Sequence, residues 1–220
     1  MRRVLPAAVL LTLVPLRAAC GPSAKDQRAL SAAIRLYHRL ELVKASQGFD
    51  DALRAVPDWK TAAGFRASCR WTLGDNAGAI TDARLAAKLR PNDAVSYAAR
   101  GRALLVLQDY EGAHADFRTV TEEYARSIEG PLGEGGVFSA QVKNREALKA
   151  LNRAVSLDPG SAAALLMRGS VKDRLRDFSA AAGDYGALLE INPNFAWARF
   201  YRGKALRELK DYRASEADFS

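Results

Sequence analysis

Small, large and apolar side chains return along residues 60–220 with a period of 34 residues. We number each unit from site 1 to site 34, with units starting at residues 60, 94, 128, 162 and 196. Small residues occupy site 8 and site 20, and most units have a large apolar residue at site 24. Site 8 is Ala67, Gly101, Gly135, Gly169 and Gly203; site 20 is Ala79, Ala113, Ala147, Ala181 and Ser215; site 24 is Ala83, Phe117, Leu151, Tyr185 and Phe219. Columns held in one register over five units indicate a repeat architecture.

These columns predict a two-helix hairpin in each unit. Small residues at sites 8 and 20 let two antiparallel helices approach closely, and the large residue at site 24 fills the space between neighbouring hairpins. Proline at site 32 ends the second helix, because it lacks an amide hydrogen and clashes with the preceding turn. The prolines are Pro57, Pro91, Pro159 and Pro193. The predicted fold class is therefore all-α.

The period and residue types resemble the tetratricopeptide repeat (TPR) family, whose unit also has 34 residues. The resemblance covers units 60–93, 94–127, 128–161, 162–195 and an incomplete unit 196–220. It implies a right-handed superhelical stack of antiparallel hairpins, an α-solenoid with a concave groove. Residues 25–59 are expected to form further helices and to be a degenerate repeat, because Gly48 to Leu53 imitate the start of a second helix.

The third unit departs from the others. Residues 128–137 read IEGPLGEGGV, and four glycines with one proline disfavour a helix. We therefore expect a loop or a broken helix near residues 129–136, acting either as a hinge or ligand-shaping loop or as an eroded repeat.

Arginine at site 7 and aspartate at site 23 are either both present or both absent in each unit. Both are present in four units, and the third unit has Glu134 and Ala150 instead. The four pairs are Arg66 with Asp82, Arg100 with Asp116, Arg168 with Asp184 and Arg202 with Asp218. Because a guanidinium can hold a carboxylate with two hydrogen bonds, we predict that each pair links the two helices of its hairpin. The alternative is that both are solvated surface charges.

The first 24 residues are typical of a secretory signal peptide. Arg2 and Arg3 precede an apolar run from Val4 to Leu16, which is too short for a membrane span of about 20 residues. Cys20 follows this run, where a bacterial lipoprotein carries its lipid, although Arg17 stands where that pattern has an aliphatic residue. Cleavage near residues 18–24 without lipid is the other interpretation. A membrane contact is expected only through such an anchor at Cys20.

Charge and chemistry restrict the function classes. The formal net charge is +8, and 30 basic against 25 acidic side chains, or +5, remain without Arg2, Arg3 and Arg17. These charges are dispersed, so we expect no nucleic-acid binding. His38 and His114 have no partners at metal-ligand spacing, and Cys69, at site 10, is expected to be buried. No metal, no cofactor and no catalytic residues are predicted.

The resemblance implies a non-catalytic protein–protein interaction scaffold that binds a peptide or a partner helix on its concave face. The expected contacts are apolar with basic points, which suits an amphipathic or acidic segment. They are Arg102, Leu105, Ser170, Asp173, Arg174, Trp197, Phe200, Lys204 and Arg207. The signal peptide implies export to a bacterial periplasm or cell envelope. The alternative is the TPR region of a co-chaperone of the endoplasmic reticulum lumen that binds unfolded clients.

Overall fold

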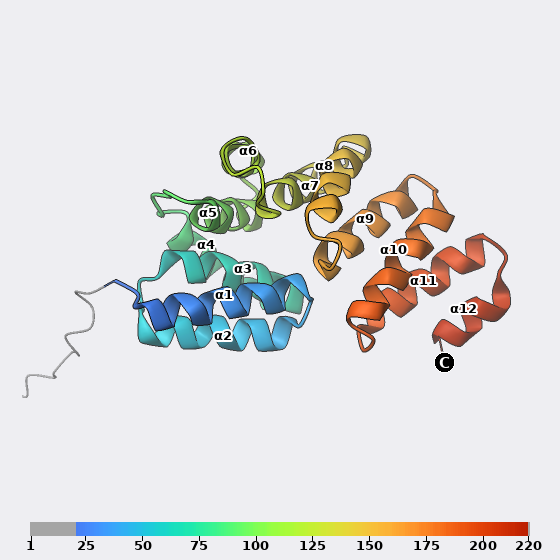
Figure 1. Cartoon of the computed structure of the whole chain (residues 1–220), viewed down its shortest axis with the longest axis horizontal. Coiled ribbons are helices and arrows are strands. Elements are labelled where there is room, and N and C mark those ends of the chain that lie inside the picture. Colours follow the sequence, from blue (N-terminus) through green and yellow to red (C-terminus); the bar gives the residue numbers. More distant parts are fainter. Residues whose placement is uncertain (1–20, 220) are drawn as a thin grey trace, which may run out of the picture.

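The computed structural model describes residues 21–219, and Figure 1 shows a curved stack of helical hairpins. Twelve helices and no strands lie in this part of the chain. The helices are α1 (Ala24–His38), α2 (Leu42–Ala55), α3 (Lys60–Leu73), α4 (Asn76–Ala86), α5 (Ala94–Val106), α6 (Tyr110–Glu123), α7 (Glu129–Ala140), α8 (Asn144–Leu157), α9 (Ala162–Arg174), α10 (Phe178–Ile191), α11 (Ala196–Glu208) and α12 (Tyr212–Phe219). The prediction of an all-α hairpin solenoid is confirmed. Most of the predicted signal peptide, with Cys20, lies outside the described residues.

One turn geometry joins the two helices of every hairpin. The residue at site 15 has a positive φ, which is 88° at Gly74 and between 58° and 65° at five residues that are not glycine. Those five are Leu40, Gln108, Val142, Arg176 and Lys210. In the hairpins that carry Asp75, Asp109 or Asp177 next, the aspartate side chain caps the second helix by accepting a hydrogen bond from a first-turn amide. The hairpin of α1 and α2 turns in the same way.

Close packing explains the columns at sites 8 and 24. A Cβ added at Gly101 would lie 2.9 Å from the Phe117 ring, and one added at Gly169 would lie 2.8 Å from the Tyr185 ring. The large side chain at site 24 therefore packs over the small residue at site 8 of its own hairpin. Phe117 also reaches the next hairpin, where a Cβ at Gly133 would lie 2.1 Å from its ring.

The predicted arginine–aspartate pairs are confirmed in all four units. Each guanidinium donates from Nε and Nη2 to the two carboxylate oxygens of an aspartate 16 residues later. The Nη2–Oδ1 distances lie between 2.5 and 2.6 Å, and all four aspartate side chains are nearly buried. Such a fork fixes the first helix of a hairpin against the second.

The expected loop at residues 129–136 is wrong, because α7 is a continuous helix over this segment. Its glycines are sites of close approach: a Cβ at Gly130 would lie 2.6 Å from the Thr121 amide nitrogen, and one at Gly135 would lie 2.5 Å from Leu151. Pro131 stands in the first turn, where its missing amide hydrogen has no intrahelical partner to lose. Burial of α7 between its neighbours outweighs the low helix propensity of glycine, which is about 1 kcal/mol per residue.

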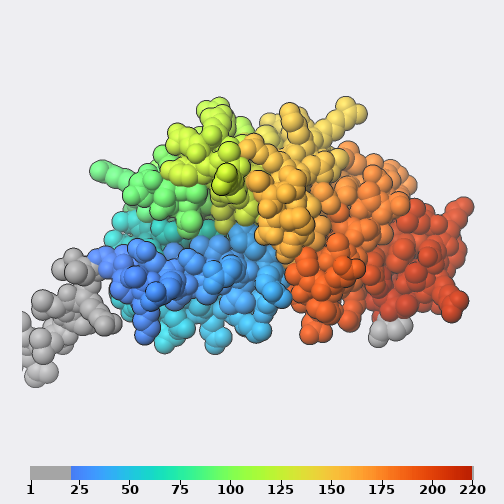
Figure 2. Space-filling model, in the orientation of Figure 1, coloured from blue at the N-terminus to red at the C-terminus, as the bar shows by residue number. Residues whose placement is uncertain are grey.

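The N-terminal hairpin turns back across the stack and contacts hairpins that lie far away in the sequence. Helix α1 packs against α9, and Leu40 packs against all three buried apolar clusters of the described chain. The side-chain Nδ2 of Asn192, between α10 and α11, donates to the Arg39 carbonyl oxygen at 3.2 Å. Figure 2 shows the blue N-terminal residues meeting the orange residues of this region without an open gap. Part of the concave side is therefore closed by the chain itself.

Candidate protein-binding surface

A buried polar cluster lies where α1 closes the concave side. Glu129, at the start of α7, accepts a hydrogen bond from Arg102 of α5 at 2.5 Å, and its other oxygen lies 2.8 Å from His38 Nε2 of α1. Arg102 also donates to the Tyr37 hydroxyl at 2.9 Å. Its guanidinium lies over the rings of Tyr37 and Phe65, 4.7 and 5.1 Å from their centroids. The cluster joins α1, α3, α5 and α7.

The charges in this cluster compensate for one another. Burial alone would raise the pKa of Glu129, but the positive charge of Arg102, together with the hydrogen-bonded His38, outweighs it and lowers that pKa to about 2. Burial raises the pKa of Tyr37, and Arg102 opposes this effect. Arg102 and Glu129 therefore form a buried ion pair beside a neutral phenol, and removing either partner alone would leave the other charge buried and uncompensated.

A second stretch of the concave side, on α9 and α11, is open. Trp197 is 60% exposed and Phe200 is 44% exposed, and their rings lie 6.0 Å apart in an edge-to-face arrangement. Lys204 Nζ lies 5.9 Å from the Phe200 ring centroid. Arg207 is exposed one turn later, so α11 presents two aromatic rings followed by two positive charges.

A hollow of about 340 Å³ adjoins this stretch. Lys204 and Glu208 of α11 line it together with Asp173 and Arg174 of α9, Arg176 of the turn and Phe178 of α10. Arg174 is exposed and is held by hydrogen bonds to Ser139. The open surface thus combines exposed aromatic rings with a rim of mostly basic side chains.

Comparison with known proteins agrees with this fold. Residues 166–220 match the model of the tetratricopeptide repeat family. A thermophilic TPR protein from Thermus thermophilus has a similar structure, with a TM-score of 0.60 and 19% identity over 83% of this chain and 99% of that protein. The described part of the chain has a TPR-like solenoid fold.

Further proteins are similar over parts of the chain. PilW, a type IV pilus biogenesis factor, has a TM-score of 0.58 and 18% identity over 89% of this chain and 91% of its own. The first TPR of Spaghetti, solved bound to an HSP90 peptide, has a TM-score of 0.52 and 21% identity over 53% of this chain and 93% of its own. Anaphase-promoting complex subunit 3 of Schizosaccharomyces pombe is 23% identical over 86% of this chain, which spans only 28% of that subunit.

The TPR register placed the predicted contact residues on the concave side, but their exposure differs. Arg102 is only 6% exposed, so its predicted role as an open peptide contact is wrong: α1 covers it. Leu105 is half-buried in the apolar cluster of the first hairpins, and Ser170 and Asp173 are half-buried on α9. The four residues on α11 and Arg174 remain accessible to a partner at least in part.

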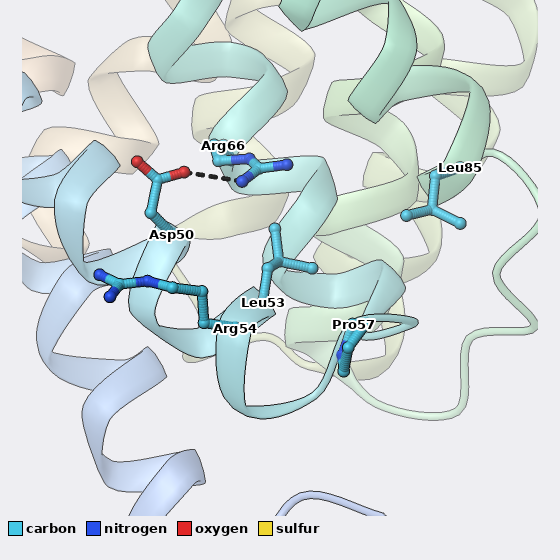
Figure 3. A pocket seen from close by; sticks show the side chains of 6 residues that line it. All are labelled: Asp50, Leu53, Arg54, Pro57, Arg66 and Leu85. Atoms are coloured by element: carbon cyan, nitrogen blue, oxygen red, sulfur yellow. Dashed lines mark hydrogen bonds and ion pairs between the residues drawn. The ribbon is translucent and has the colours of Figure 1, made fainter. Parts of the chain in front are cut away.

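Two features of this helical array were not predicted from the sequence. His38 and Glu129 carried no signal, because they are 91 residues apart and belong to hairpins that are not neighbours in the stack. A hollow of about 490 Å³ also lies between α2, α3 and α4, where Asp50 accepts a hydrogen bond from Arg66 at 2.7 Å (Figure 3). The predicted burial of Cys69 is confirmed, and burial raises the pKa of its thiol to about 12.

Within residues 21–219, no group of three or more histidine, cysteine, aspartate or glutamate side chains is placed to hold a metal ion. In the same range, no helix combines the length and apolar character that a bilayer span requires.

Proposed function

We propose that this TPR solenoid is a non-catalytic scaffold that binds an amphipathic or acidic polypeptide segment on α9 and α11. The observation that carries the proposal is the pair of exposed rings, Trp197 and Phe200, beside Lys204 and Arg207. Large aromatic side chains are unfavourable in water, and aromatic and arginine residues are enriched among the residues that dominate binding energy.

The buried polar cluster restricts the part of the concave side that a partner can contact. Since α1 covers Arg102, a partner has access to the C-terminal hairpins but not to the groove between α1, α5 and α7. A short helix of a few turns, or an extended segment of similar length, matches this remaining surface. The first TPR of Spaghetti, solved bound to an HSP90 peptide, is a precedent for peptide binding by this fold.

Selection of a random peptide display library on the protein tests the proposal. We expect enrichment of peptides that combine apolar and acidic residues. Charge reversal of Lys204 and Arg207 to glutamate should weaken the selected peptides at least tenfold, which is about 1.4 kcal/mol. The matched control reverses two exposed basic residues, Arg84 in the last turn of α4 and Lys88 just after that helix. Equal loss in both variants, or selection of peptides without acidic residues, would contradict the proposed surface.

The proposed location is outside the cytoplasm, in a bacterial periplasm or cell envelope. It rests on the order of positive, apolar and small residues in positions 1–24. Fusion of these residues to a reporter that is active only after export tests it, and a silent reporter contradicts it. Incorporation of labelled fatty acid, absent from a Cys20→Ala variant, would show lipidation.

The alternative is a co-chaperone of the endoplasmic reticulum that holds unfolded clients. The same exposed rings favour it, because exposed aromatic surface binds apolar segments without a defined sequence. Suppression of aggregation of a denatured client, lost on Trp197→Ala with Phe200→Ala, would support this alternative. Selection of one defined peptide motif, together with no effect on aggregation, would support the scaffold.

A further inference from the structure

The third unit lacks the ion pair that links the two helices in the other four units, and a hollow lies in its place. Sites 7 and 23 are Glu134 and Ala150 in this unit. The hollow has a volume of about 370 Å³, and its lining combines carboxylates, an aromatic ring and basic side chains. The lining residues are Glu134, Phe138, Glu146, Lys149, Ala150 and Arg153. It lies on α7 and α8, apart from the aromatic side chains of α11.

Two other units show which side chain ordinarily occupies site 7 and what it contacts. In the second hairpin the Arg66 guanidinium holds Asp82 from its own hairpin and Asp50 from the preceding one, at 2.6 and 2.7 Å (Figure 3 shows the contact with Asp50). Arg168 likewise spans Asp184 and Asn152. A guanidinium between successive second helices is thus a recurring element of this chain, and the third unit replaces it with a carboxylate.

The Glu134 carboxylate forms the polar part of the floor. Its side chain is only 15% exposed, and it accepts one hydrogen bond, from the Thr121 hydroxyl at 3.1 Å. His114 Nε2 lies 3.9 Å away, and the His114 ring packs at 5.1 Å from the Phe138 ring. A carboxylate offers about four acceptor positions, so Glu134 retains room for a further donor.

We propose that this hollow binds an arginine side chain of a polypeptide partner, with the guanidinium between the Glu134 carboxylate and the Phe138 ring. The apolar stem of the arginine would lie against Ala150, which is buried at the site of the usual aspartate. A charge at the half-buried floor acts through a lower effective dielectric than charges at the exposed rim. The negative charge of Glu134 therefore favours a positively charged group at the floor. Lys149 and Arg153 at the rim favour acidic residues next to that arginine in the partner.

The proposal is independent of the surface on α9 and α11, and a small probe tests it directly. Backbone amide resonances of the isotope-labelled protein are followed by NMR while N-acetyl-arginine amide is added. The citrulline analogue, which has the same shape without the charge, and inorganic phosphate are titrated in parallel. We expect saturable shifts at amides of α7 and α8 with the arginine compound and none there with the other two.

Two variants separate binding from folding. Glu134→Gln removes the charge, keeps an acceptor for Thr121, and should weaken the arginine compound at least tenfold. Glu134→Arg with Ala150→Asp rebuilds the ion pair of the other repeats, so it should fill the hollow, abolish the shifts and leave the melting temperature no lower. Glu111→Arg, on the exposed side of α6, is the charge control. Non-saturating shifts, equal shifts with citrulline, or phosphate binding at these amides would overturn the proposal.

Discussion

Removing the charge of Glu129 should strongly destabilise the closed arrangement of the N-terminal hairpin. Glu129→Gln leaves the Arg102 guanidinium buried with the Tyr37 hydroxyl as its best remaining partner. Breaking a buried pair in this way costs about 3–5 kcal/mol, since the remaining charge is uncompensated. The lowering of the Glu129 pKa from 4.5 to about 2 corresponds to about 3 kcal/mol. Both routes predict a loss of about 3 kcal/mol.

Urea unfolding at pH 7, followed by circular dichroism, measures this loss. A second variant, Arg102→Met with Glu129→Leu, removes both charges and replaces them with apolar groups of similar size. It should be more stable than Glu129→Gln, because the desolvation cost disappears together with the attraction, and the remaining loss comes from His38 and Tyr37, which each lose a hydrogen-bond partner. A loss below about 1 kcal/mol for Glu129→Gln, or a double variant no more stable than the single one, would refute the reasoning.

The same pair makes a pH prediction. Because the folded pKa of Glu129 lies below the unfolded value, its stabilising contribution is present above pH 4.5 and is lost as the pH falls towards 2. The difference in unfolding free energy between wild type and Glu129→Gln should therefore shrink over this range. A difference that stays constant from pH 7 to pH 2 would show that Glu129 does not act as a charge.

Further substitutions test the packing described above, each by thermal or urea unfolding. Gly133→Ala should destabilise by about 2 kcal/mol or more, because its Cβ would lie 2.1 Å from the Phe117 ring. Gly183→Ala, with open space around the new Cβ, should instead stabilise α10 by about 0.5–1 kcal/mol. Val142→Gly should stabilise by up to about 1 kcal/mol, since a β-branched residue at φ 59° is strained. Alkylation of Cys69, whose burial raises its pKa to about 12, should follow unfolding instead of preceding it.

The sequence predicted the parts of the fold that depend on neighbours in the chain. The 34-residue columns indicated the hairpins. The joint absence of arginine and aspartate from one unit correctly predicted the four arginine–aspartate ion pairs within hairpins. The arginine and aspartate of each fork are only 16 positions apart. A period repeated five times makes such contacts visible without coordinates.

The sequence did not predict what depends on distant hairpins. Low glycine propensity suggested a loop at residues 129–136, yet burial between α6 and α8 keeps α7 helical. Arg102 stood at a groove site by its register, but nothing local indicates that Tyr37, 65 residues earlier, covers it. Propensity and register describe one hairpin and its neighbours, whereas exposure is decided by the curvature of the whole stack.

The contacts of Leu40 with every buried cluster of the described chain constrain the number of units between the first hairpin and α9. In an open array each module touches only the next, so a module can be gained or lost with little effect elsewhere. Here the turn between α1 and α2 must contact α9 and Asn192, and this contact depends on how many modules lie between α2 and α9. Duplicating or deleting one 34-residue unit between α3 and α8 would separate the turn between α1 and α2 from α9 and Asn192. The segment from α1 to α9 is thus fixed in length by a contact between its two ends, unlike an open repeat array.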